Sequence, residues 1–129
     1  MSPPPGDRAR LWAVRGAVQV ERNARDAILA STTELMQELM ARNQLDPERM
    51  VSCIFTCTDD LDAEFPAVAA RQMGLSRVPL LCAREIPVPG ALPRVIRVLM
   101  HCYPPVGVDP QHVYLGDARR LRLDLEGAQ

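Results

Sequence analysis

The sequence predicts an α+β fold in which a mixed β-sheet carries its helices on one face. The chain has 129 residues, a length that suits one compact domain. Five segments read as strands and two as helices, in the order β-α-β-α-β-β-β, which favours this architecture. We expect a flexible Pro-rich tail at residues 1–10, a single domain at residues 11–125 and a flexible tail at residues 126–129.

The first predicted strand covers residues 11–20, where apolar side chains alternate with others. Arg15 falls on the face opposite the apolar set, and Gly16 beside it leaves room for another group to approach the backbone. The clearest predicted helix follows at residues 24–42, because its apolar residues recur every three or four positions. Asn23 is its expected N-cap and Asn43 its expected left-handed stop.

The remaining elements follow from local pattern and turn residues. We expect a helical turn starting at residues 46–47, a strand at 51–58, a helix at 65–74, strands at 78–86, 94–100 and 112–115, and a helical turn at 116–121. Within the fourth strand, Arg97 shares a face with Val95 and Leu99, an unusual position for a permanent charge.

The charged residues exclude several classes of function. All 15 basic residues are arginine, and 16 acidic residues give a net charge of −1. A nucleic-acid-binding domain normally has a basic excess gathered in a patch. The absence of lysine excludes a Schiff base, a P-loop lysine and a pyridoxal phosphate anchor. The general preference for arginine over lysine is typical of a compositional bias.

The cysteines and histidines do not predict a metal site. Cys53 and Cys57 lie four residues apart in one predicted strand, roughly 13 Å along it, whereas zinc binds each thiolate at about 2.3 Å. His101 and His112 fall in predicted strands, where packing or hydrogen bonding explains them. The four cysteines lack paired C-x-x-C spacing and a secretory leader, so we expect reduced thiols, a cytoplasmic location and no metal or cofactor. No window approaches the ~20 apolar residues of a membrane span.

Three arginines and one carboxylate are the candidate functional residues. Arg15 and Arg97 lie on predicted strands, Arg71 on a short helix, and Glu85 at the end of a strand beside a Pro-rich turn. A guanidinium group binds carboxylates with two parallel hydrogen bonds. These arginines could therefore form a pocket for a small molecule with more than one carboxylate. Alternatively, each pairs with an Asp or Glu at the surface.

The sequence resembles the monofunctional chorismate mutases of the Bacillus type over residues 11–125. Matching stretches occur in the order and spacing of that family: Val14-Arg15-Gly16-Ala17, Phe65-Pro66-Ala67, Ala70-Arg71, Val78-Pro79-Leu80, Cys82-Ala83-Arg84-Glu85, Gly90 with Arg94-Val95-Ile96-Arg97-Val98, and His112-Val113-Tyr114-Leu115. Each tripeptide is a weak signal, but the ordered set is specific.

The resemblance implies a homotrimer whose sheets form a pseudo-α/β barrel, with active sites in clefts between subunits. It implies an isomerase that converts chorismate to prephenate in aromatic amino-acid biosynthesis, without a cofactor. The implied catalytic residues are Arg97, Glu85 and Arg15. The implied substrate-binding residues are Arg71, Tyr114, Phe65, Cys82, Leu121 and Arg122.

Two other functions remain open at this stage. A non-catalytic trimeric protein that binds a small carboxylate would keep the arginines but would not need Glu85 opposite Arg97. An enamine or imine deaminase on a similar trimeric fold is the second alternative. The residues from Cys82 to Glu85 and from Arg94 to Val98 favour the mutase over that deaminase.

Overall fold

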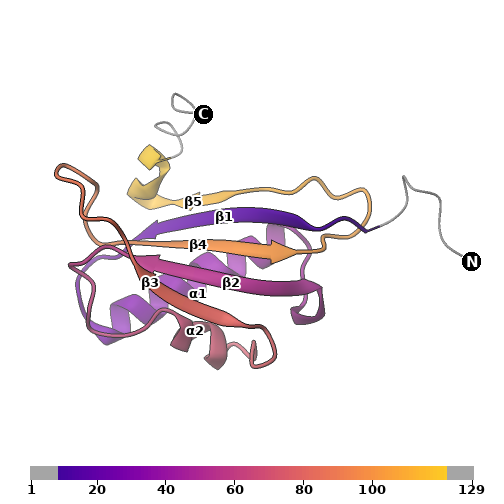
Figure 1. The fold of residues 1–129 in the computed structure, drawn as a ribbon, viewed down its shortest axis with the longest axis horizontal. Helices are drawn as coiled ribbons and strands as arrows, with labels where there is room; N and C mark the ends of the chain where they lie inside the picture. Colours follow the sequence, from indigo (N-terminus) through magenta and orange to yellow (C-terminus); the bar gives the residue numbers. More distant parts are fainter. Residues whose placement is uncertain (1–8, 122–129) are drawn as a thin grey trace, which may run out of the picture.

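A computed structural model of the chain describes residues 9–121. Five strands form one mixed sheet in the order β3-β2-β4-β1-β5 (Figure 1). Their bounds are β1 Trp12–Gln19, β2 Met50–Cys57, β3 Leu80–Arg84, β4 Val95–Cys102 and β5 Val113–Leu115. The central strand β4 is antiparallel to both β1 and β2, while the outer strands β5 and β3 run parallel to β1 and β2.

Two α-helices, α1 (Arg25–Arg42) and α2 (Ala67–Gln72), lie behind the sheet in Figure 1. Short 3-10 turns, η2 (Pro47–Arg49) and η3 (Gly116–Ala118), precede β2 and follow β5. The predicted α+β class, the order of elements and the placement of the helices on one face are therefore confirmed. The predicted C-terminal tail, most of the predicted N-terminal tail and Arg122 lie outside the described residues.

The sheet buries one face against α1 through the alternating side chains that the pattern predicted. Val14 and Val18 of β1 join Phe55 of β2 and buried residues of α1 in one core. The space beside Gly16 is filled by this helix. A Cβ atom at position 16 would lie 2.8 Å from Cδ1 of Leu39 and 2.9 Å from Cδ1 of Leu35. The expectation that Gly16 lets another group approach the backbone is confirmed, and that group is α1, which the glycine allows to pack closely.

Of the two asparagines predicted to cap α1, Asn43 occupies the C-cap position and Asn23 does not occupy the N-cap position. Ala24 occupies the N-cap position without a side-chain hydrogen bond, and Asn23 Oδ1 instead accepts the backbone N–H groups of Asp62 and Ala63, each at 3.1 Å. Asn43 has φ −103° rather than a left-handed conformation. Its buried amide binds the Leu39 carbonyl and the backbone of Gln111. Asn23 therefore makes long-range hydrogen bonds in place of a local cap, whereas Asn43 caps the end of α1 and also binds a distant segment.

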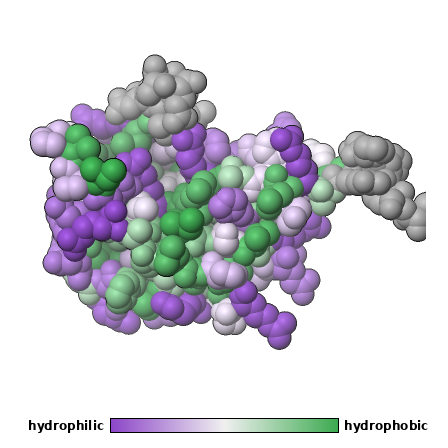
Figure 2. All heavy atoms as spheres, viewed as in Figure 1, coloured by the Kyte–Doolittle hydropathy of each residue, from purple (hydrophilic) through white to green (hydrophobic). Residues whose placement is uncertain are grey.

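The other face of the sheet, which we call the open face, is covered by neither α1 nor α2 (Figure 1). In Figure 2, which views this face, apolar side chains gather over the sheet between polar groups. A small second core of Ala17, Val95 and Ala118 forms where η3 packs on it. Leu81 of β3 remains 61% exposed beside this region. The open face therefore combines apolar surface with the charged side chains described below. In the part of the chain that the structure describes, no helix has both the length and the apolar character to cross a membrane.

Candidate functional site

Glu85 and Arg97 form an ion pair on the open face. Glu85 follows β3, where its backbone N–H donates to the Cys57 carbonyl at 2.8 Å. Arg97 projects from the central strand, and its Nε lies 2.9 Å from Glu85 Oε1. The Glu85 side chain is 20% exposed and that of Arg97 44% exposed. The pair leaves Oε2 of the carboxylate and the terminal Nη groups of the guanidinium for a bound molecule.

Sheet pairing brings two further predicted residues to this pair. Ala17 of β1 pairs with Arg97 on one side and with Tyr114 of β5 on the other. Arg15, two residues earlier on the same face, lines a cavity of about 270 Å³ together with Arg97 and Tyr114. The Arg15 backbone N–H donates to His112 Nδ1 at 2.9 Å, which ties β1 to the segment just before β5.

A second cavity, of about 510 Å³, lies on the other side of Arg97 and is lined by Glu85, Arg97 and Leu121. Arg97 thus borders both cavities. We call the five predicted residues gathered here the sheet cluster: Arg15, Glu85, Arg97, Tyr114 and Leu121. Its two cations, Arg15 and Arg97, beside one carboxylate suit a small anionic molecule, and its fixed donors can stabilise negative charge that develops during a reaction.

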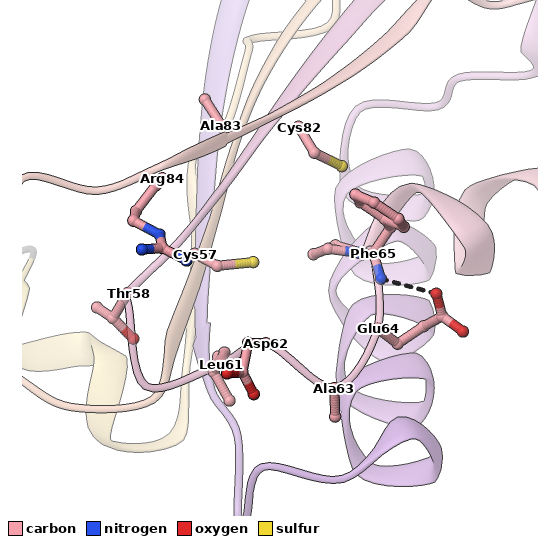
Figure 3. A pocket seen from close by; sticks show the side chains of 11 residues that line it. Cys57, Thr58, Leu61, Asp62, Ala63, Glu64, Phe65, Cys82, Ala83 and Arg84 are labelled. Atoms are coloured by element: carbon pink, nitrogen blue, oxygen red, sulfur yellow. Dashed lines mark hydrogen bonds between the residues drawn. The ribbon is translucent and has the colours of Figure 1, made fainter.

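Phe65 and Cys82 lie elsewhere, in a cavity of about 390 Å³ between the end of β2, β3 and the loop before α2. We call this the edge pocket. Cys82 pairs with Phe55 in the sheet, so its side chain lies on the face covered by the helices. Figure 3 shows the thiols of Cys57 and Cys82 pointing toward the side that carries Phe65. The Phe65 residue is 65% exposed, so the pocket presents an aromatic ring to its surroundings.

Glu64 fixes the backbone at the edge pocket. Its Oε1 accepts the Phe65 backbone N–H at 2.9 Å (Figure 3). Its Oε2 accepts Arg25 Nε at 2.9 Å. The hydrogen bond from Phe65 is the main cause that lowers the pKa of Glu64, and Arg25 and Arg71 lower it further. Arg71 is exposed on α2, and its charge interaction with Glu64 places it near this pocket rather than beside Arg97.

The buried thiols beside these sites are protonated. Burial raises the pKa of Cys57 to about 12, with smaller contributions from Cys82 and Glu85. Burial likewise raises the pKa of Cys53 to about 12, with a contribution from Cys102. A protonated thiol is a weak nucleophile and a poor metal ligand. Among residues 9–121, no three His, Cys, Asp or Glu side chains are grouped so that they could hold a metal ion.

The structure therefore divides the predicted site residues between two places. The sheet cluster lies on the open face, whereas Phe65, Cys82 and Arg71 belong to the side of the sheet that the helices cover. The structure adds two residues that the sequence interpretation did not include. Thr56 donates a hydrogen bond to Glu85, and Arg120 lines the larger cavity beside Leu121. Thr56 shares the strand alternation of the open face, but only the pairing register places it beside Arg97.

Comparison with known proteins gives consistent results. Residues 11–125 match the model of the family described as chorismate mutase type I. Chorismate mutase AroH of Thermus thermophilus is 51% identical over 118 residues, which cover 90% of this chain and 97% of that protein. The protein of the same name from Bacillus subtilis is 40% identical over 117 residues, covering 89% and 92%.

Solved structures also include a relative. A chorismate mutase from Clostridium thermocellum superposes with a TM-score of 0.81 at 46% sequence identity, covering 84% of this chain and 98% of that one. The family match includes residues 11–121 of the described chain. The chain also covers 92–98% of the length of these three relatives. The chain belongs to the chorismate mutase type I family.

Proposed function

We propose that this chain is an isomerase that rearranges chorismate to prephenate, at sites between the subunits of a cytoplasmic homotrimer. The observation that carries the proposal is the Glu85–Arg97 pair, held on the open face of the sheet beside two cavities. The reaction is unimolecular and pericyclic, since one C–O bond breaks while one C–C bond forms. The protein's task is to hold the compact conformer of the substrate and to stabilise uneven charge in the transition state.

Arg97 and Glu85 stabilise opposite ends of that charge distribution. As the C–O bond breaks, the ether oxygen becomes more negative, and the Nη groups of Arg97 donate hydrogen bonds to it. The ring becomes more positive, and the Glu85 carboxylate lies on that side and accepts from the ring hydroxyl. A preorganised donor to a developing oxyanion contributes about 3–4 kcal/mol to transition-state stabilisation.

The other residues bind and orient the substrate. Arg15, Tyr114 and Arg71 hold its carboxylates, and Phe65 supplies an apolar wall. Cys82 contributes packing, and Leu121 and Arg122 are further substrate-binding residues. None of these roles needs a metal or cofactor.

The placement of the two groups of residues supports a site shared between chains. Within one chain, the sheet cluster and the edge pocket lie on opposite faces of the sheet, so one small substrate cannot contact both. A neighbouring subunit that presents its edge pocket to the sheet cluster would complete the site. Exposed Leu81 and half-buried Ile54 and Leu99 give the open face apolar surface that a subunit interface would bury. In a trimer, such contacts close the sheets into a pseudo-α/β barrel.

A direct assay tests the activity: the purified protein is incubated with chorismate, and loss of chorismate and formation of prephenate are followed. We expect conversion far above the uncatalysed rate. Conversion at the uncatalysed rate would favour instead a protein that only binds a small carboxylate.

A mixing experiment tests the shared site. The variants Arg97→Ala and Arg71→Ala are purified separately, and each should be inactive on its own. They are then unfolded, mixed in equal amounts and refolded together. If the two arginines come from different subunits of a closed ring, about a quarter of the sites regain both arginines by random assembly. Activity should recover to about that fraction of wild type. The absence of recovery, with trimers shown by light scattering, would contradict the shared site.

A further inference from the structure

We propose that Thr56 is a positioning residue for the reaction, which aims the Glu85 carboxylate by binding one of its oxygens. The inference rests on the proposed role of Glu85 in the site. Thr56 Oγ1 donates to Glu85 Oε1 at 2.6 Å, and Arg97 Nε approaches the same oxygen at 2.9 Å. Thr56 does not need to touch the substrate to have this effect.

The strand register makes this arrangement rigid. Thr56 of β2 pairs directly with Arg97 of β4 on one side and with Ala83 of β3 on the other. Glu85 follows two residues after Ala83, so its side chain leaves β3 on the same face. Three adjacent strands therefore supply the carboxylate and its two donors. The carboxylate is anchored at Oε1, and Oε2 remains for the substrate.

The hydroxyl of Thr56 makes this contact, whereas the strand requires only the branched shape of the threonine side chain. Valine has nearly the same shape and favours strands equally well. A Thr56→Val variant therefore keeps the packing but leaves Oε1 with Arg97 as its one donor. The carboxylate can then rotate, and it can also draw Arg97 away from the direction in which the substrate needs it.

We expect Thr56→Val to lower kcat about tenfold or more, the range typical of a lost hydrogen bond to a charged group. The KM should change less than threefold, because the residues that hold the substrate carboxylates are untouched. Thr56→Ser restores the hydroxyl and should return kcat to within about threefold of wild type. Thr33→Val on α1 is the matched control, since Thr33 is half-buried and lines none of the three cavities described above.

A double-mutant cycle separates positioning from a general loss of structure. In the Glu85→Gln background, the further change Thr56→Val should lower kcat less than threefold, because the carboxylate that Thr56 aims is gone. Equal fold-losses in both backgrounds, or failure of Thr56→Ser to restore kcat, would overturn the inference. Thermal melts check folding, and Thr56→Ala replaces the valine variant in the cycle if that variant does not fold.

The same experiment distinguishes the two levels of the proposal. If Glu85→Gln alone keeps wild-type kcat, the proposed role of Glu85 in the site fails, and the positioning role fails with it. If Glu85→Gln lowers kcat but Thr56→Val does not, the site stands and only the positioning role is refuted.

Discussion

The sheet cluster and the edge pocket differ in how much of their geometry one chain determines. In the sheet cluster, Glu85 and Arg97 are bound to each other and stand in a fixed strand register. In the edge pocket, the Phe65 ring is largely exposed, and hydrogen bonds hold only its backbone. The charged part of the proposed site is thus preorganised in the single chain, while the apolar part is exposed for a neighbouring molecule. We expect substitutions in the two places to have different kinetic effects.

The largest expected effect is on the sheet cluster. Arg97→Ala should lower kcat by two to three orders of magnitude, or about 3–4 kcal/mol, because a donor to the developing oxyanion is lost. Arg97→Lys should also fail badly, since a single ammonium group cannot bind Glu85 and the substrate as the guanidinium does. Steady-state kinetics measure both variants, and light scattering checks that the assembly persists. Near wild-type turnover in Arg97→Ala would remove the electrostatic role of the sheet cluster.

Gly16 lets α1 pack against the strand that carries Arg15 of the sheet cluster. Gly16→Ala places a methyl group within 3 Å of Leu35 and Leu39 side-chain atoms, so we expect a loss of about 1–3 kcal/mol in the free energy of unfolding. Chemical denaturation measures this loss. Ala17→Gly is not a suitable control, because it removes a buried methyl group. Gly107→Ala is a more informative comparison. Its added methyl group meets open space, so any loss of stability comes from the positive backbone φ of 89° at this position. An unchanged unfolding free energy in Gly16→Ala would show that α1 can move away from the sheet at little cost.

The edge pocket should respond mainly in substrate binding. Phe65→Ala should raise KM about tenfold, since one aromatic side chain supplies 1–3 kcal/mol of apolar contact when buried by substrate. The free energy of unfolding should change by less than about 0.5 kcal/mol, because the ring is exposed in the chain. A fall in kcat as large as that of Arg97→Ala, with KM unchanged, would contradict a role of the edge pocket in substrate binding alone.

The smallest expected effect distinguishes the thiols of the edge pocket. At pH 8, iodoacetamide should modify the partly exposed Cys82 before Cys57, whose pKa of about 12 keeps it protonated. The sign follows from burial, which disfavours the thiolate and so raises the pKa. Peptide mass spectrometry at short reaction times measures the order. Faster labelling of Cys57 would show that the loop carrying Phe65 opens readily.

The sequence predicted the residues of each strand face better than it predicted which strands meet. Alternation placed Arg15 opposite the apolar side chains of its strand and Arg97 on one face with Val95 and Leu99, because period two is a local property of a strand. The contact of Thr56 with Glu85 depends on three strands whose pairing is set by long-range packing. A single chain sequence does not show that register, so Thr56 was missed. The predicted N-cap Asn23 was wrong for a related reason, since its amide binds residues 62 and 63, far away in the chain.

The separation of Arg71 from Arg97 also could not be read from local pattern. Both arginines were expected to contribute to one anion pocket. Arg71 lies on α2, behind the sheet, whereas Arg97 points to the open face. Within a single chain the pocket is therefore incomplete.

The central position of β4 has a consequence for how the protein is made. β1 and β2 come first in the chain, but they do not touch in the sheet, because β4 lies between them. A nascent chain that ends before residue 95 has helices and strands but lacks the strand that joins its two halves. The two halves of the sheet can be joined only after Cys102 has left the ribosome, so most of its stabilisation is gained late and at long sequence separation. The residue that we propose as the main catalytic donor, Arg97, therefore enters the fold with the strand that joins these halves, before β5 is added at the edge.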